Sequence, residues 1–360
     1  MKVSRKNTKL SGRERLLSAA RGEEVDCTPV WFMRQAGRYL PQYREIRKRY
    51  SILEICKMPD LCKNVTLMPV KELGVDAAVM FADIMLPLEG IGIKFQIEDN
   101  LGPVISNPVT KISSAEQLKT FDAKRDVPFV LQAIKKTREQ MDKESKAAAL
   151  VGFSGAPFTL ASYIIEGQAT RDFTKTKNLM YNDGDTWRVL MTKLSKMVSD
   201  YLSAQIESGV DAVQIFDSWV GSLSIQDYTK FVSPYTERIS DTLRKDYPDT
   251  PRIHFGTNTL HLLKPMSRGI KKGDVFSIDW RIPINTAKKI LGSKTPIQGN
   301  LEPAVLLSND KRGFIAERTQ EVIEEAKSLA GHIFNLGHGM LRDTPVENAK
   351  FVVDYVHAHT

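Results

Sequence analysis

Short apolar stretches recur along the whole chain, and most of them follow a segment with helical spacing and end at a polar residue or a glycine. Eight of these stretches are rich in β-branched and aromatic residues and have the length of strands. Their apolar residues are nearly continuous rather than alternating, which is typical of parallel strands that are covered on both faces. The predicted strands are residues 29–34, 76–83, 148–155, 211–218, 252–257, 274–280, 295–300 and 332–339.

Two of the predicted strands are entered in the same way, through ELGVDAAVMF at 72–81 and ESGVDAVQIF at 207–216. In each, we expect a helix to end at a glycine cap, Gly74 or Gly209, before the strand begins. Eight strand–helix units, with a polar residue at the carboxyl end of nearly every strand, favour a closed barrel over a doubly wound sheet. We therefore predict an α/β fold that forms one TIM (β/α)8 barrel domain over residues 13–360.

Three segments depart from the strand–helix alternation. IKFQIEDNLGPVISNP at 93–108 predicts a β-hairpin, and KTREQMDKESK at 136–146 predicts a charged, exposed helix end. The basic N-terminus, residues 1–12, lacks the apolar run of a secretory signal, and we expect a disordered tail there. None of these segments marks a boundary between two folded domains.

The composition is that of a globular protein, with 42% hydrophobic and 26% charged residues, and it excludes a disordered or collagen-like chain. The 51 Lys and Arg against 43 Asp and Glu give a net charge of +8, which favours anionic partners of some kind. The charge alone leaves nucleic acid, lipid headgroups and polycarboxylates open. The basic residues are scattered, without interleaved aromatic residues, so we expect no nucleic-acid partner.

The longest apolar stretch, 148–165, is interrupted by glycine, serine and proline, so we expect no membrane span. The three cysteines, Cys27, Cys56 and Cys62, show no CxxC spacing and suggest neither a disulfide framework nor a zinc clip. Their sparse use favours a reducing, cytoplasmic location.

Polar side chains at the carboxyl ends of the predicted strands should converge on one face of the barrel. They are Arg34, Gln35, Arg38, Asp83, Ser154, Ser218 and His338. The arginines of RQAGR carry forked donors that suit carboxylates, although a solvated helix start has the same composition. Asp83 is equally compatible with a lone carboxylate at the site and with a helix N-cap.

The remaining candidates are weaker when taken alone. Either Asp217 or Ser218 could cap the next helix, and a tyrosine such as Tyr163 on an apolar helix usually belongs to the core. The glycines around His338 would let its ring approach a ligand, whereas His332 lies inside a predicted strand and should be packed.

Missing motifs narrow the chemistry further. No lysine and no HxH pair ends a predicted strand, and the sequence contains no HxC pair, no P-loop and no glycine-rich dinucleotide fingerprint. We therefore expect no metal and no nucleotide. The residues that remain suit a reaction that uses cations, an acid and one carboxylate on a polyanionic substrate.

Six motifs, in this order, resemble those of the uroporphyrinogen decarboxylase family: PVWFMRQAGRYLPQYREIR, FADIMLPL, GFSGAPFTLASYIIEG, QIFDSWVG, QGNLEP and FNLGHG. The resemblance runs from about Arg13 to the C-terminus. It implies a cytoplasmic TIM-barrel homodimer of heme biosynthesis that removes the four acetate carboxylates of uroporphyrinogen III as carbon dioxide and yields coproporphyrinogen III. It also implies that the enzyme needs no metal and no organic cofactor.

The resemblance also assigns site residues. It implies that the substrate is bound by Arg34, Gln35, Ala36, Gly37, Arg38, Arg47, Asp83, Tyr163, Ser218 and His338. Four of these are implied to be catalytic: Asp83, Arg34, Tyr163 and His338. Asp83 would accept hydrogen bonds from the pyrrole nitrogens, and the general acid stays open among the other three.

Two other functions fit part of the pattern. Related barrels are zinc-dependent methyltransferases, but these cysteines all lie in the first quarter of the chain, away from the later strand ends. A non-catalytic binder of anions would explain the net charge, but it leaves Asp83 unexplained at an anionic site.

Overall fold

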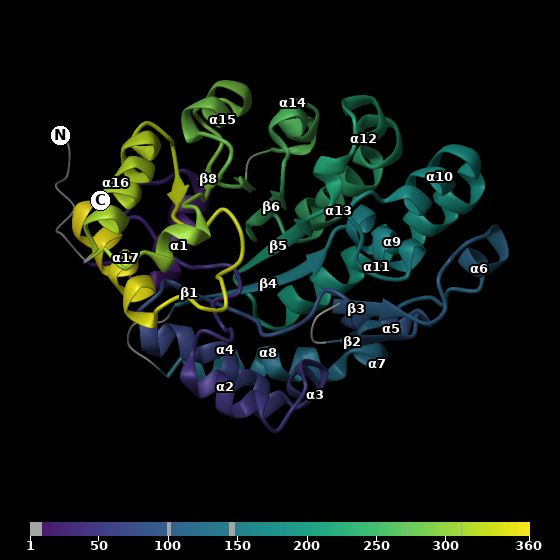
Figure 1. The fold of residues 1–360 in the computed structure, drawn as a ribbon, viewed down its shortest axis with the longest axis horizontal. Coiled ribbons are helices and arrows are strands. Elements are labelled where there is room, and N and C mark those ends of the chain that lie inside the picture. Colours follow the sequence, from purple (N-terminus) through teal and green to yellow (C-terminus); the bar gives the residue numbers. More distant parts are fainter. Residues whose placement is uncertain (1–8, 99–101, 144–147, 272, 311) are drawn as a thin grey trace.

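The computed structural model describes residues 9–98, 102–143, 148–271, 273–310 and 312–360. Its centre is a curved sheet of seven strands in the order β1-β4-β5-β6-β7-β8-β9, and each neighbouring pair is parallel (Figure 1). The strands are β1 (Ala77–Val79), β4 (Ala149–Gly155), β5 (Ala212–Asp217), β6 (Arg252–Gly256), β7 (Asp274–Ser277), β8 (Ile297–Gln298) and β9 (His332–Ile333).

The first predicted strand along the chain, 29–34, is the remaining strand of the barrel. It closes the ring through a single parallel bridge between Val30 and Phe334. On one side of it, Trp31 N donates to Phe334 O at 3.2 Å; on the other side, Asp76 N donates to Val30 O at 2.8 Å. The segment therefore lies between β9 and β1 and completes the ring. The prediction of a TIM barrel is confirmed, although this strand is much shorter than predicted.

Side chains replace part of the ladder at this closure. Val30 N donates to the Asp76 carboxylate at 2.8 Å, and Met33 N donates to Asn335 Oδ1 at 3.0 Å. Both amides are satisfied in this way although no regular strand pairs with them. The sequence pattern predicted the apolar segment, but it could not show that side chains would bind its backbone.

Helices surround the sheet on its outer side (Figure 1). The helices of eight or more residues are α1 (Gly12–Arg21), α4 (Pro59–Leu73), α8 (Pro128–Met141), α9 (Pro157–Glu166), α10 (Thr174–Asn182), α11 (Gly184–Ser208), α13 (Ser233–Asp246), α15 (Ile284–Leu291), α16 (Gly313–Ala326) and α17 (Val346–His359). The shorter ones are α2 (Pro41–Arg47), α3 (Ile52–Lys57), α5 (Leu86–Gly90), α6 (Ile112–Glu116), α7 (Ala123–Asp126), α12 (Ile225–Phe231) and α14 (Leu263–Met266), and the 3-10 turns η1 (Val220–Ser222), η2 (Leu260–Leu262), η3 (Ser267–Gly269) and η4 (Pro303–Leu307).

Local signals explain several helix ends. The two helices before β1 and β5 end at Gly74 and Gly209 with φ of 74° and 115°, which confirms the predicted glycine caps. At the start of α1, Ser11 and Glu14 form a reciprocal capping box. The expected tail falls mainly on residues 1–8, which lie outside the described residues, and the fold already includes Ser11.

The predicted hairpin is confirmed as β2 (Phe95–Glu98) paired antiparallel with β3 (Gly102–Ile105). Its turn lies outside the described residues. The predicted charged helix end belongs to α8, which stops at Met141, and residues 144–146 of that prediction also lie outside the described part.

A layer of buried polar side chains crosses the barrel interior. Gln298 Nε2 donates to Gln214 Oε1 and to Ser277 Oγ, both at 2.9 Å, and none of the three side chains is exposed. Gln214 and Gln298 lie on strands that β6 and β7 separate, so the two amides must meet across the interior. Within the described ranges, no helix is both long and apolar enough to cross a membrane.

Candidate active site

The expected site residues lie where the strands of the barrel end. Ala36, Gly37 and Arg38 occupy the turn after the Val30 segment and are partly exposed. Four further residues follow other strands of the barrel: Asp83 after β1, Tyr163 on α9 after β4, Ser218 after β5 and His338 after β9. Arg47 is the last residue of α2, and its Nη1 donates to Tyr50 O at 2.7 Å.

Asp83 closes a tight turn rather than capping a helix. Its Oδ1 accepts the Met85 amide at 2.9 Å and its carbonyl accepts the Leu86 amide at 3.2 Å. The N-cap of α5 is Met85, which makes no side-chain cap. The N-cap alternative for Asp83 is therefore wrong. Among the residues that the structure describes, no donor reaches Asp83 Oδ2 within hydrogen-bond distance.

The negative charge of the Asp83 carboxylate is disfavoured by burial and only partly stabilised by neighbouring groups. Burial raises the pKa of Asp83 above its ordinary value, and the Met85 amide and the Arg34 guanidinium act in the opposite direction. A further donor or cation beside the carboxylate would favour its ionised form. Such an environment suits a ligand that carries N–H groups and positive charge.

Arg34 reaches the same region from the turn that follows Trp31. Its backbone is left-handed, with φ of 58°, which costs an arginine roughly 1–2 kcal/mol. Its side chain runs along Gly339, where a Cβ atom would lie 2.8 Å from Arg34 Cγ. Gly339 therefore leaves the space that the arginine occupies. The Arg34 guanidinium acts electrostatically on Asp83, Tyr163 and His338, so these four residues lie in one region at the strand ends.

Gln35 is turned away from this site. It is 1% exposed, its Nε2 donates to Ala77 O at 2.9 Å, and its Oε1 accepts the Phe32 amide at 3.0 Å. Its side chain therefore ties the turn to β1. We assign Gln35 to positioning the neighbouring arginines rather than to direct contact with a ligand.

Tyr163 lies on α9, near enough to Asp83 for that carboxylate to act on its hydroxyl. Its ring lies 5.8 Å from that of Trp219, centroid to centroid. The pKa of Tyr163 is raised to about 12, mainly by burial and also by the Asp83 carboxylate, while Arg34 acts in the opposite direction. The hydroxyl is therefore protonated at neutral pH and can donate a hydrogen bond. The alternative of an isolated core tyrosine is not supported, because two charged site residues act on it.

Ser218 is half-buried, and its carbonyl accepts Thr257 Oγ1 at 2.5 Å. Neither it nor Asp217 caps the following turn, since η1 has Trp219 as its N-cap without a side-chain hydrogen bond. The Asp217 carboxyl group instead accepts Thr159 Oγ1 at 2.8 Å, and burial raises its pKa to about 7. Asp217 therefore binds α9, and Ser218 stays at the strand end.

His338 has an aromatic environment. Its ring centroid lies 6.5 Å from that of Phe255 and 6.1 Å from that of Trp280. Burial lowers the pKa of His338 to about 4, with Arg34 and Arg281 acting in the same direction and Asp279 against it. His338 is therefore neutral at pH 7. His332, in contrast, binds Gly299 O at 2.7 Å within the barrel wall, in agreement with the predicted packed role.

The sequence analysis missed two residues of this region, Trp280 and Arg281. Trp280 packs against Gly337, where a Cβ atom would lie 2.8 Å from Trp280 Cα. The Arg281 guanidinium carbon lies 3.7 Å from the centroid of the Trp280 ring. The strand-end rule that selected the other candidates would have found both, because the predicted strand 274–280 ends at Trp280.

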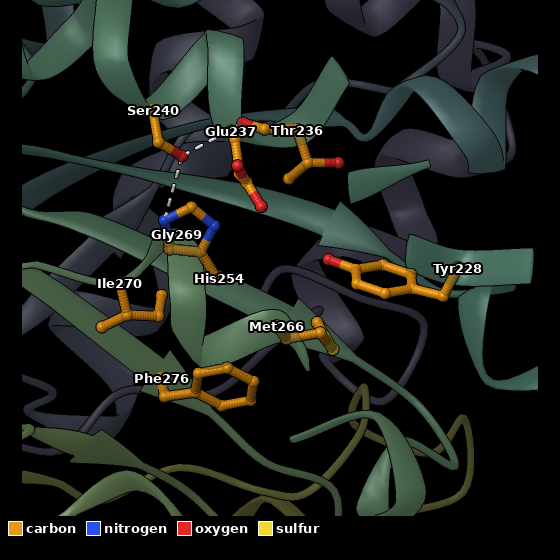
Figure 2. Close-up of a pocket in the computed structure, with 9 residues that line it drawn as sticks. All are labelled: Tyr228, Thr236, Glu237, Ser240, His254, Met266, Gly269, Ile270 and Phe276. Carbon is orange, nitrogen blue, oxygen red and sulfur yellow. Dashed lines mark hydrogen bonds between the residues drawn. The ribbon is translucent and has the colours of Figure 1, made fainter. Parts of the chain in front are cut away.

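A small cavity of about 20 Å³ lies elsewhere, between β6 and α13. Figure 2 shows its lining, in which Ser240 Oγ lies 3.5 Å from His254 Nε2. Holding one water molecule takes about 10–15 Å³, so the cavity has the size of a solvent site rather than that of a substrate site. It sits among the outer helices, away from the strand ends that carry Asp83 and His338.

The described side chains form neither a metal-binding group nor a disulfide. Across the described ranges, no three His, Cys, Asp or Glu side chains are grouped so that they could hold a metal ion. Cys27, Cys56 and Cys62 are all buried free thiols.

Comparison with known proteins gives consistent results at the level of sequence. The family model described as uroporphyrinogen decarboxylase (URO-D) matches residues 11–359. A Sorangium cellulosum protein named uroporphyrinogen decarboxylase is 46% identical over 345 residues, which is 96% of this chain and 96% of that protein. A Thermus thermophilus protein of the same name is 46% identical over 341 residues, 95% of this chain and 96% of that protein.

The solved structures support the fold alone. A methyltransferase from Methanosarcina mazei superposes with a TM-score of 0.80 at 20% identity, covering 96% of this chain and 98% of that one. A B12-independent methionine synthase from Shewanella sp. W3-18-1 gives a TM-score of 0.56 at 10% identity, covering 86% and 89% of the two chains. At these identities a shared activity does not follow.

Proposed function

Because the chain belongs to the uroporphyrinogen decarboxylase family, we propose that it removes the four acetate carboxylates of uroporphyrinogen III as carbon dioxide and yields coproporphyrinogen III. It is accordingly a carboxy-lyase of porphyrin and heme biosynthesis, and its small-molecule substrate is uroporphyrinogen. The observation that carries the assignment beyond the relatives' names is Asp83. Its carboxyl group lies at the end of β1 with Oδ2 open to a donor and with Arg34 nearby.

Each decarboxylation can be written with the substrate as its own electron sink. A proton adds to a pyrrole ring carbon and leaves an iminium-like cation. The bond to the acetate carboxylate then breaks, carbon dioxide leaves, and the bond electrons neutralise the cation. Protonation of the resulting exocyclic carbon and loss of the proton that was first added to the ring carbon restore the pyrrole and leave a methyl group. The ionised Asp83 stabilises the cation by accepting hydrogen bonds from pyrrole N–H groups in a site of low dielectric constant.

The other residues bind and orient. Arg34, Arg38 and Arg47 bind carboxylates, and Arg34, the nearest of these to Asp83 by its electrostatic effect, serves the scissile one. Tyr163 and Ser218 donate hydrogen bonds from hydroxyl groups. His338 is neutral at pH 7, so it acts through a hydrogen bond and not as a protonated acid. Tyr163 and Arg34 remain as the two groups that could deliver the proton.

We further propose that the enzyme is a cytoplasmic homodimer that works without a metal or organic cofactor. Three free buried thiols support a reducing compartment. Sedimentation of the purified chain tests the dimer, and a dimer of twice the 40.5 kDa chain mass is expected. Activity that persists after exhaustive chelation supports independence from metals.

Anaerobic incubation with uroporphyrinogen tests the function. Products are oxidised and separated by their number of carboxylates. We expect stepwise loss down to the tetracarboxylate without any added cofactor. A folded, chelated enzyme that leaves the octacarboxylate intact would contradict the proposal and would favour a methyltransferase related to the M. mazei protein.

A further inference from the structure

The loop after β7 places a cation beside His338 that none of the expected site residues provides. The Arg281 guanidinium lies over the Trp280 ring, with its central carbon 3.7 Å from the ring centroid. The Trp280 ring meets the His338 ring nearly at a right angle, 87°, with centroids 6.1 Å apart. Contact with an indole orients a guanidinium without using its N–H donors. Trp280 therefore holds Arg281 at the end of the strand, next to His338.

The backbone under this arginine is fixed by a buried carboxylate. Asp279 has no exposed side-chain surface, and its Oδ1 accepts the Arg281 amide at 2.8 Å. Its Oδ2 accepts the Asn258 amide from the loop after β6, and its carbonyl accepts Asn300 Nδ2 at 2.9 Å from the residues after β8. Asp279 thereby joins three loops at the barrel end and sets the direction in which Arg281 leaves the backbone.

A purely structural alternative is that Arg281 serves to neutralise Asp279. The geometry does not favour it, since Arg281 Nη1 lies 3.5 Å from Asp279 Oδ2, beyond the about 2.7–3.2 Å of a good hydrogen bond. Two backbone amides already satisfy the carboxylate. The Arg281 side chain stays 47% exposed, and in the described parts of the chain no other carboxylate pairs with it. The guanidinium is therefore available to an anion from outside the protein.

The charge distribution of the site explains what this cation adds. Arg34, Arg38 and Arg47 all belong to the single segment between the first strand and α3. On the β7 side of the barrel the expected site residues supply no cation, and His338, which follows β9, is neutral at pH 7 because its pKa is lowered to about 4. A macrocycle with carboxylates around its whole rim needs a cation on that side as well.

We propose that Arg281 binds a peripheral carboxylate of the substrate on the β7 side of the barrel, in addition to those bound by the arginines that follow the first strand. This inference rests on the proposed function, because that function supplies a substrate with carboxylates on every pyrrole. Trp280 and Asp279 are positioning residues for the arginine.

Two variants and one control test the inference. Arg281→Ala removes the cation, and Arg281→Lys keeps a charge but loses the planar fork. Arg268→Ala is the control, because Arg268 is an exposed arginine in η3, which precedes the same strand at its opposite end. Measurements are kcat and KM with uroporphyrinogen and, separately, the Kd of uroporphyrin from the anisotropy of its own fluorescence. Uroporphyrin is an octacarboxylate that cannot be decarboxylated by this route.

For Arg281→Ala we expect KM and Kd to rise by about tenfold, the loss of one charge-assisted hydrogen bond. We expect kcat to stay within about twofold, as for an interaction made equally in ground and transition states. Arg281→Lys should recover part of the affinity, and Arg268→Ala should match the wild type. The difference between wild type and Arg281→Ala should shrink at high salt.

Unchanged KM and Kd in a folded Arg281→Ala protein would overturn the inference. A loss of kcat at unchanged KM would also overturn it, because it would mean a role in holding the loops instead of the substrate. If the wild type binds uroporphyrin but does not decarboxylate uroporphyrinogen, the proposed function fails, while a drop in uroporphyrin affinity in Arg281→Ala would still support the anion site.

Discussion

The carboxylate of Asp76 lies 2.7 Å from His357 Nε2, through the same Oδ2 atom that accepts the Val30 amide at 2.8 Å. The other oxygen of Asp76 accepts Arg15 Nη1 at 3.0 Å. One buried side chain thus joins the first helix, the closing segment of the barrel and the C-terminal helix α17. It lies at the amino ends of the strands, on the opposite side of the barrel from Asp83, so its role is stability and not catalysis.

Asp76→Asn should destabilise the protein without changing the site. Removing one partner from a buried ion pair costs about 3–5 kcal/mol, and asparagine retains part of that because it can still accept the Val30 amide. We expect a loss of about 3 kcal/mol, measured as a lower urea midpoint at unchanged slope.

Asp185→Asn is the matched control, because Asp185 is 79% exposed and pairs with Arg188 one helical turn away. Such surface pairs contribute about 0–1 kcal/mol, so its midpoint should hardly move. Equal midpoints for Asp76→Asn and Asp185→Asn would refute the structural role given to Asp76.

Asp217 should make the folded state less stable as pH rises. Its pKa in the folded protein is raised from an ordinary value near 3.8 to about 7 by burial. Between these two values the unfolded chain has released the proton while the folded chain retains it, so rising pH favours unfolding, by as much as roughly 4 kcal/mol over the full interval.

Asp217→Asn removes this titration but can still accept the Thr159 hydroxyl. We expect the urea midpoint of the variant to fall less than that of the wild type between pH 5 and pH 8. Parallel curves for the two proteins over this range would mean that Asp217 stays ionised in the folded state.

Gly339→Ala should disturb the site through Arg34 alone. An added Cβ would lie 2.8 Å from Arg34 Cγ and would displace that side chain. We expect a loss of kcat/KM of about tenfold, as for a misplaced charged group, with little change in the urea midpoint. Gly184→Ala is the control, since a Cβ there meets nothing within 4 Å. Similar activity in both variants would show that Arg34 does not depend on Gly339.

The repeating pattern of strands and helices was sufficient to predict the barrel and the end of it that carries the site. Parallel strands in a closed ring all end on the same side, so Asp83, Ser218 and His338 could be grouped without coordinates. The glycine caps at Gly74 and Gly209 were equally visible, because a left-handed cap depends on local sequence.

The rest depends on contacts between residues far apart in the chain. The shortness of the first strand follows from Asp76 and Asn335, which bind backbone amides 46 and 302 residues away. Gln35 points inward because the left-handed backbone at Arg34 redirects the turn, and a sequence window does not reveal that direction. The strand-end rule could have selected Arg281 from the sequence, but its contact with Trp280 and the closeness of Trp280 to His338 depend on the fold.

The central claim is that the Asp83 carboxylate stabilises a cationic pyrrole during decarboxylation. The most direct test compares wild type with Asp83→Asn, whose side chain can still accept the Met85 amide, in single-turnover decarboxylation and in uroporphyrin binding. We predict a rate at least about a hundredfold lower, the scale seen when one group that stabilises charge in a transition state is removed, with Kd changed by less than about fivefold. A folded Asp83→Asn enzyme that decarboxylates at the wild-type rate would contradict the account.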